Sequence, residues 1–157
     1  MAPFEPRDPG FAARVRASFA RQTAMATLGA RLVAVAPGAV EIALPFRADL
    51  AQQHGYLHGA ITTAIADSAC GYAALSLLPA GAEVLTVEYK VNFLAPAAGL
   101  AFVARGRVTK PGRTLTVCAG DVVARDADGR ERPVATMLAT MMALPPRDEA
   151  ATPHPGG

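Results

Sequence analysis

The stretch GAITTAIADSACGYAALSLL, residues 59–78, decides the fold of this 157-residue chain. It is small and apolar on every side, and Asp67 is its only charged residue. Twenty such residues could cross a membrane, but a carboxylate in mid-run among several Thr and Ser residues argues against a membrane span. A helix that is apolar all round is otherwise a buried helix. We therefore predict a long helix whose Ala, Ser and Gly residues pack closely against a sheet.

The residues before this stretch predict a helix and a hairpin. Residues 10–28 place apolar side chains among arginines at roughly helical spacing, which predicts one amphipathic helix ending near Gly29. Residues 30–46 predict two strands joined by a turn at Ala36, Pro37 and Gly38.

Four candidate strands follow the long helix. They cover residues 83–95, 100–109, 114–125 and 134–144, and the second and third flank a turn at Lys110–Arg113. In the first of them, alternation places one set of apolar residues on one face: Leu85, Val87, Tyr89, Val91 and Phe93. The order is helix, hairpin, long helix and antiparallel meander, so we expect an α+β fold in which the sheet curls around the central helix.

The chain is expected to form one domain with two appendages. We predict an N-terminal helical segment at residues 1–29, the main α+β domain at residues 30–144, and a disordered tail at residues 145–157, which is rich in proline. The start of the chain has no apolar core of a secretory signal, so a cytoplasmic location is expected.

The composition excludes several kinds of partner. Fifteen Lys and Arg against thirteen Asp and Glu give a net charge of +2, which is too mild to predict binding to nucleic acid or to an anionic membrane. The two cysteines, Cys70 and Cys118, form no C-x-x-C spacing. We predict no metal and no cofactor.

Asp67 is the residue that most needs an explanation. A carboxylate inside an apolar element is costly unless it is paired, shifted in pKa or solvated by a cleft. A structural role, capping a loop or pairing with an arginine, is one interpretation. The other is catalysis, because burial of this kind turns a carboxylate into a general base near neutral pH.

His58 and Gly59 open the same helix. Helix N-termini carry unsatisfied N–H groups, so the Gly59 and Ala60 amides are candidates to hold a developing oxyanion, although an ordinary turn has the same sequence. Gly59 and Asp67 are eight residues apart, about 12 Å at ~1.5 Å per residue. Groups that serve one carbonyl should lie within roughly 5–7 Å. If both residues are catalytic, two antiparallel helices from a homodimer should form two shared sites.

These residues also resemble a known family. The segment from Gln52 through His58, Gly59 and Ala60, followed by Ala66 and Asp67, resembles the N-x-x-G-x-x-H-G-G…A-D signature of hotdog thioesterases of the phenylacetate-degradation type, and residues 86–96 look like that family's next strand. The resemblance covers about residues 30–144 and implies that they form a hotdog thioesterase domain, an antiparallel sheet wrapped around a long central helix. It departs from the signature where Gln52 replaces Asn and Ala60 replaces the second Gly.

The resemblance implies hydrolysis of acyl-CoA thioesters without a cofactor, by a dimer that pairs into a tetramer in some relatives. Asp67 is then general base or nucleophile, Gly59 polarises the carbonyl and His58 orients the loop. Thr86 assists the water, and Gln52 contacts water or carbonyl.

Other residues are weaker candidates for substrate contacts. Lys110 and Arg113 are expected to bind the phosphates of coenzyme A, although an exposed basic turn is an equal interpretation. Tyr56 and Tyr72 are candidates to line an acyl pocket. Cys70 is a candidate nucleophile, but packing in the core is the favoured interpretation of this residue. Two other functions stay open: a non-catalytic acyl-CoA-binding module and a hotdog hydratase or dehydratase centred on His58.

Overall fold

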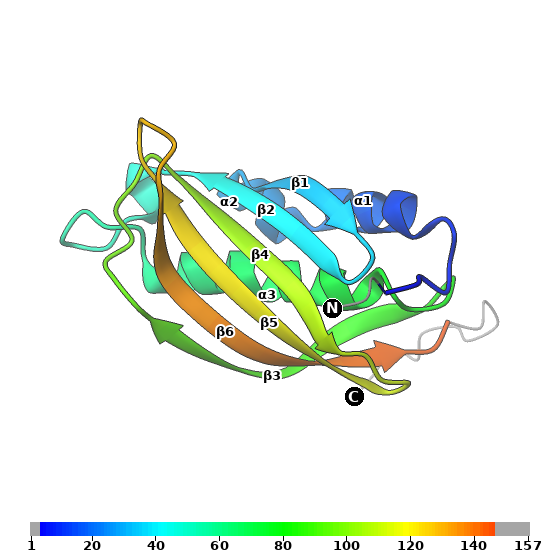
Figure 1. Cartoon of the computed structure of the whole chain (residues 1–157). Coiled ribbons are helices and arrows are strands. Elements are labelled where there is room, and N and C mark those ends of the chain that lie inside the picture. The colour runs from blue at the N-terminus through cyan, green and yellow to red at the C-terminus, as the bar shows by residue number, and fades with distance from the viewer. Residues whose placement is uncertain (1–3, 147–157) are drawn as a thin grey trace, which may run out of the picture.

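The computed structural model describes residues 4–146. Six antiparallel strands form one curved sheet around the long helix α3, Gly59–Leu75, and α1 (Phe11–Arg21) and α2 (Thr23–Leu28) lie beside that helix (Figure 1). The strands are β1 (Arg31–Ala36), β2 (Ala39–Pro45), β3 (Glu83–Phe93), β4 (Ala101–Lys110), β5 (Leu115–Arg125) and β6 (Glu131–Leu144). A short 3-10 helix, Ala48–Leu50, precedes the loop to α3. The predicted α+β hotdog fold is confirmed.

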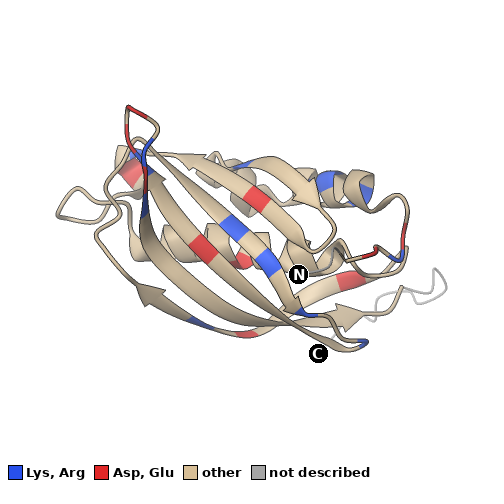
Figure 2. Cartoon of the chain, viewed as in Figure 1, with Lys and Arg blue, Asp and Glu red and all other residues tan. Residues whose placement is uncertain are grey.

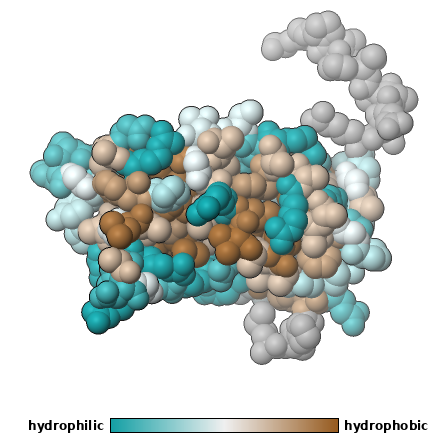
Figure 3. Space-filling model, turned by 90° about the horizontal axis from the view of Figure 1, so that it is seen from above, coloured by the Kyte–Doolittle hydropathy of each residue, from teal (hydrophilic) through white to brown (hydrophobic). Residues whose placement is uncertain are grey.

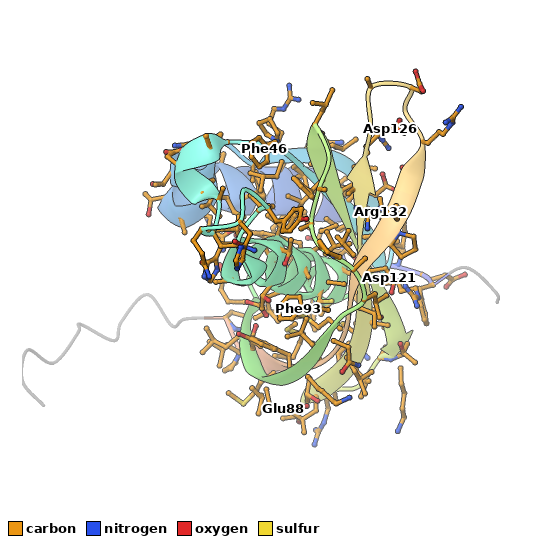
Figure 4. The ribbon with its side chains drawn as sticks, turned by 90° about the vertical axis from the view of Figure 1, so that its left-hand side faces the viewer. Phe46, Glu88, Phe93, Asp121, Asp126 and Arg132 are labelled. Atoms are coloured by element: carbon orange, nitrogen blue, oxygen red, sulfur yellow. The ribbon has the colours of Figure 1, made fainter. Side chains whose placement is uncertain are left out.

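The sheet differs from a simple meander in the place of β3. Its strand order is β1-β2-β4-β5-β6-β3, so β3 pairs with β6 at one edge and β2 pairs with β4. The expected meander therefore holds only for β4, β5 and β6. The chain leaves β3 at one edge and re-enters the sheet beside β2, which leaves α3 enclosed in the concave side of the sheet (Figures 1 and 4).

The N-terminal helix is also broken where one helix was predicted. Gln22 has extended backbone angles, φ −79° and ψ 92°, and separates α1 from α2. Val15 of α1 and Met25 of α2 are buried in the same core as α3. Gly29 ends α2 in the left-handed conformation, φ 76°, as its sequence predicted.

Two glycines allow α3 to lie directly on the sheet. Gly106 and Gly120 face each other in the β4–β5 register. A Cβ on Gly106 would collide with the backbone of Ala69, and one on Gly120 would lie 2.8 Å from the Cys70 Sγ. The sheet therefore has a notch that receives α3 two to three residues after Asp67.

Charged residues are distributed over strands of the sheet, α1 and the loops (Figure 2). Arg105 bonds to Glu41 at 3.0 Å and to Glu131 at 2.7 Å, and Arg107 bonds to Asp121. The guanidinium groups of Arg105 and Arg125 both bond to Glu131 and hold the pKa of its carboxyl down to about 2. The view from above shows apolar patches among hydrophilic residues (Figure 3). No helix within residues 4–146 is long and apolar enough to cross a membrane.

Candidate active site

Asp67 lies on the side of α3 that faces the edge strand β3. Its carboxylate opens into a cavity of about 220 Å³ between α3, α1 and β3. The Thr86 hydroxyl donates a hydrogen bond to Asp67 Oδ1 at 2.8 Å. Burial raises the pKa of Asp67, and the Thr86 hydrogen bond opposes this only in part. No cation in the described part of the chain forms an ion pair with it.

A β-bulge brings Thr86 to this carboxylate. In the pairing of β3 with β6, Thr86 faces Met141 and Glu88 faces Thr140, so Val87 is an extra residue. The bulge puts Thr86 on the same helix-facing side as Phe93, while Glu88 points to the outer face, where it accepts a hydrogen bond from Thr140 (Figure 4). The expectation that Leu85 and Phe93 share a face was therefore wrong, because an inserted residue reverses the alternation of faces and cannot be recognised in the sequence pattern.

The start of α3 holds a free backbone donor. His58 is the N-cap residue, and its Nδ1 accepts a hydrogen bond from the Ala60 amide at 3.0 Å. This acceptor role requires the ring proton on Nε2. The Gly59 amide has no hydrogen-bond acceptor within residues 4–146. Of the two amides that the sequence suggested, Gly59 is thus the one available to a ligand.

The loop before α3 forms a second cavity around Gly59. This cavity measures about 570 Å³ and is lined by Gln52, Tyr56, Gly59 and Phe93, among others. Gln52 Oε1 accepts a hydrogen bond from the His54 amide, which leaves the Gln52 side-chain NH₂ free to face a ligand. The Phe93 ring lies so close to Gly59 that a Cβ there would come within 2.9 Å of it.

The sequence candidates therefore fall into two groups within one chain. Asp67 and Thr86 line the smaller cavity, whereas Gln52, Tyr56 and Gly59 line the larger one. Tyr72, a sequence candidate for the acyl pocket, also lines the smaller cavity. The sequence analysis did not single out two other polar residues of its lining, Ser18 and Gln22. Their signal was hidden because both lie in residues 10–28, which looked merely amphipathic.

Three further candidates, Lys110, Arg113 and Cys70, lie outside both cavities. Lys110 and Arg113 are exposed in the β4–β5 turn, and Arg113 lines a separate hollow together with Arg7. Cys70 is fully buried beneath Gly120, and burial raises the pKa of its thiol well above its usual range. A buried thiol of this kind is a packing residue and not a nucleophile.

Comparison with known proteins identifies the family. A model of the thioesterase superfamily matches residues 54–130, which include Gly59, Asp67 and Thr86. A candidate esterase of Saccharolobus solfataricus is 31% identical over 103 residues, 66% of this chain and 71% of that protein. A thioesterase family protein of Silicibacter pomeroyi is 57% identical in sequence, and its crystal structure covers 86% of this chain and 98% of its own, with a TM-score of 0.84. The chain belongs to the thioesterase superfamily.

Other solved thioesterase structures place the chain among the hotdog members of that superfamily. A phenylacetic acid degradation-related protein of Ralstonia eutropha is 25% identical, with a TM-score of 0.72 over 84% of this chain and 98% of its own. The PaaI protein of Escherichia coli, at 20% identity, has the same fold, with a TM-score of 0.77 over 87% of this chain and 94% of its own. The resemblance to thioesterases of the phenylacetate-degradation type is confirmed.

Proposed function

We propose that this thioesterase-superfamily protein hydrolyses acyl-CoA thioesters, with Asp67 as the residue that activates water. The observation that carries the proposal is the state of Asp67. Its carboxylate has a raised pKa, opens into a cavity and is bonded to a single hydroxyl. An aspartate that served only the fold would cap a helix or pair with an arginine, and Asp67 does neither. A half-buried carboxylate without a cation is suited to take up a proton.

Each step of the hydrolysis has a residue to perform it. Asp67 removes a proton from water, whose oxygen attacks the thioester carbon, while Thr86 orients the carboxylate. The Gly59 amide donates to the oxygen that becomes negative, and the free NH₂ of Gln52 contacts the same oxygen or the water. The C–S bond then breaks, and protonated Asp67 returns its proton to the sulfur of coenzyme A. Direct attack by Asp67 on the thioester is a variant that uses the same groups.

One chain does not bring these groups together, so we propose a homodimer with shared sites. Gly59 and Asp67 are separated by eight residues of one helix, about 12 Å. They also line different cavities. Antiparallel packing of two α3 helices would bring the partner's Gly59 to Asp67 and would join the two cavities. Association of such dimers into a tetramer stays a prediction.

The free edge of β3 supports this assembly. Leu85, Val87, Tyr89 and Phe93 are each about half exposed, between 46% and 58%. A long apolar edge strand is an open template for pairing with another strand. Along β3, Phe93 lies beside Gly59 of α3, and Thr86 lies beside Asp67. Two antiparallel β3 strands that bring Phe93 beside the partner's Thr86 therefore have their two-fold axis near Tyr89.

Charge complementarity selects the register at that axis. With Tyr89 on the axis, each Glu88 lies opposite the partner's Lys90, which gives two identical ion pairs. With Lys90 on the axis, two like charges would face each other. We therefore propose the register centred on Tyr89.

Lys110, Arg113 and Arg7 are proposed to contact the phosphates of coenzyme A. All three are exposed, and Arg113 lines one hollow with Arg7. An Arg fork and a Lys ammonium are suitable partners for phosphate oxygens.

A hydrolysis assay tests the proposed reaction. Release of coenzyme A from a panel of acyl-CoA thioesters is followed with a thiol reagent, and Asp67→Asn serves as the control chain. A protein that binds the panel but releases no thiol would be a binding module instead. A hydratase is the less favoured alternative, because His58 contacts the Ala60 amide and not a carboxylate, so a His-centred acid–base dyad lacks its second member.

A further inference from the structure

The smaller cavity follows α3 away from Asp67. Its lining on this helix comprises Asp67, Ser68, Gly71, Tyr72 and Leu75, so it extends from position 67 to position 75, eight rises or about 12 Å of helix. Ser18 of α1 and Gln22, which directly follows α1, form one wall, and residues 83–86 of β3 form the other. Nothing in the hydrolytic step described above uses this extension beyond Asp67.

Gly71 forms the floor of the cavity and has no packing reason to be glycine. A Cβ on Gly71 would meet no atom within 4 Å, in contrast to Gly106 and Gly120, which are in contact with α3. Its φ does not lie in the left-handed region. Glycine inside a helix costs stability relative to alanine. The fold therefore gains nothing from glycine here, and the missing side chain only keeps the cavity open.

Beyond the Asp67 carboxylate, the cavity carries polar atoms that are weakly bonded. Gln22 Nε2 lies 3.4 Å from the Ser68 hydroxyl, and the Tyr72 hydroxyl lies 3.5 Å from Gln22 Oε1. Both distances are at the upper limit for a hydrogen bond, so a ligand group with better geometry can replace them. Gln22 is also the residue at which α1 and α2 separate, without a Gly or Pro that would cause the break.

We propose that this cavity binds the acyl group of the substrate, that Gly71 sets the size of that group, and that Gln22 and Tyr72 recognise a polar atom at its end. The proposal rests on the proposed thioester hydrolysis and specifies its substrate class. The cavity around Gly59, about 570 Å³, has room for the longer pantetheine arm, whereas the cavity of about 220 Å³ suits the acyl part.

The volume and length of the smaller cavity define the size of the acyl group. A protein cavity of about 150 Å³ holds a benzene molecule, so a cavity of about 220 Å³ holds a ring with a short arm or a chain of similar size. Tyr72 lies five residues beyond Asp67, about 7.5 Å along the axis. Three single bonds of extended chain span about 3.6 Å, so about six bonds reach that level. The substrate class is a medium-sized acyl group with a hydroxyl or similar group at its far end.

Substitution of Gly71 tests the size limit. For Gly71→Ala and Gly71→Leu, kcat/KM is measured with acetyl-CoA, hexanoyl-CoA and phenylacetyl-CoA. A single methylene in an apolar pocket changes kcat/KM by about 10–200-fold. We expect losses of about tenfold or more for hexanoyl and phenylacetyl with Gly71→Ala, larger losses with Gly71→Leu, and no loss for acetyl. The melting temperature of Gly71→Ala should rise. Equal losses for all three substrates would overturn the proposal.

Two controls distinguish a role of Gly71 in the acyl pocket from a role in the dimer interface and from failure of the proposed hydrolysis. Sedimentation of both Gly71 variants must give the oligomer of the wild type, because a dissociated variant would make Gly71 an interface residue and refute its role in the pocket. Titration calorimetry with S-hexyl-CoA and S-methyl-CoA measures the same size dependence without turnover. A wild type that hydrolyses no thioester would refute the proposed reaction, while selective loss of S-hexyl-CoA binding in Gly71→Leu would still support the binding site. Unchanged binding of both analogues would refute the site.

Gln22→Leu tests the polar end. The ratio of kcat/KM for 6-hydroxyhexanoyl-CoA to that for hexanoyl-CoA is compared between wild type and variant, so any general loss of folded protein cancels. We expect the wild type to favour the hydroxylated chain and the ratio to fall by about tenfold or more in Gln22→Leu, because a site built to bond a hydroxyl discriminates strongly. An unchanged ratio would exclude Gln22 from recognition.

Discussion

Complementation between two inactive chains is the strongest test of the two-chain site. Gly59→Pro removes the proposed oxyanion donor, and Asp67→Asn removes the proposed base. Gly59 is the first residue of α3, a position where proline fits because its N–H is not needed by the helix. His58 already has φ −63° and ψ 137°, the extended conformation that a residue before proline prefers. Gly59→Pro should therefore fold while losing only this donor.

The expected magnitudes follow from the symmetry of the dimer. Loss of one oxyanion donor costs about 10²–10³ in kcat, and loss of a general base costs about 10²–10⁴. Each homodimer should thus retain at most about 1% of wild-type activity. Co-expression in equal amounts yields heterodimers in about half of the assemblies, and one of their two sites contains both intact residues. About a quarter of wild-type activity should return, measured as thiol release per chain.

The steric control in this experiment is Gly59→Ala. It places a Cβ against the Phe93 ring, as proline does, but retains the amide. Gly59→Ala should therefore be more active than Gly59→Pro. Recovery of no more than the summed residual activities, from a sample in which mixed-tag purification proves that heterodimers exist, would refute the shared site.

Three further outcomes follow from the structure. Asp67→Asn should lower kcat by at least about 10² without loss of stability, and the wild type should lose activity on acidification at a pH above the ordinary aspartate value near 3.9. Because the folded-state pKa is raised, protonation of Asp67 stabilises the fold fully below the unfolded-state pKa, and this stabilisation is lost as pH rises through the folded-state pKa. The free energy of unfolding of Asp67→Asn, measured in denaturant, should therefore exceed that of the wild type at pH 7, and the difference should be absent below about pH 4. Lys90→Glu should raise the dimer dissociation constant about tenfold in sedimentation, and the charge swap Glu88→Lys/Lys90→Glu should restore it, unless the β3 strands pair in another register. Replacement of Lys110 and Arg113 by Ala should raise KM for acyl-CoA and leave pantetheine thioesters unaffected; equal effects on both substrates would make the turn a structural element.

The sequence was most informative where one residue contrasted with its surroundings. Asp67 was conspicuous as the one charge in an apolar helix, and the same apolarity required a sheet that wraps around α3. The order of strands could not be predicted from the sequence, because nothing in residues 83–95 distinguishes an edge strand beside β6 from a strand beside β4. Edge position depends on which connection crosses the sheet, and that is a property of the whole chain.

Local irregularities account for most of what the sequence did not reveal. The bulge at Val87 is invisible in an alternating apolar pattern, yet it turns Thr86 toward Asp67. The break at Gln22 has no Gly or Pro signal. In the sequence, Gly71 looked like one small residue among many. Only the empty space around it in the structure distinguishes it from Gly106 and Gly120.

The glycine notch behind α3 has a consequence for how this site can change. A helix that advanced by one residue would also turn by about 100°, and the notch would then meet a different side chain instead of the Ala69 backbone. The sheet thus sets both the height and the orientation of the carboxylate, two to three residues away. Chemistry at position 67 and pocket size at position 71 can therefore vary while the frame stays fixed. In contrast, Gly106 and Gly120 touch no cavity that contains Asp67, yet enlarging either one would displace the carboxylate itself.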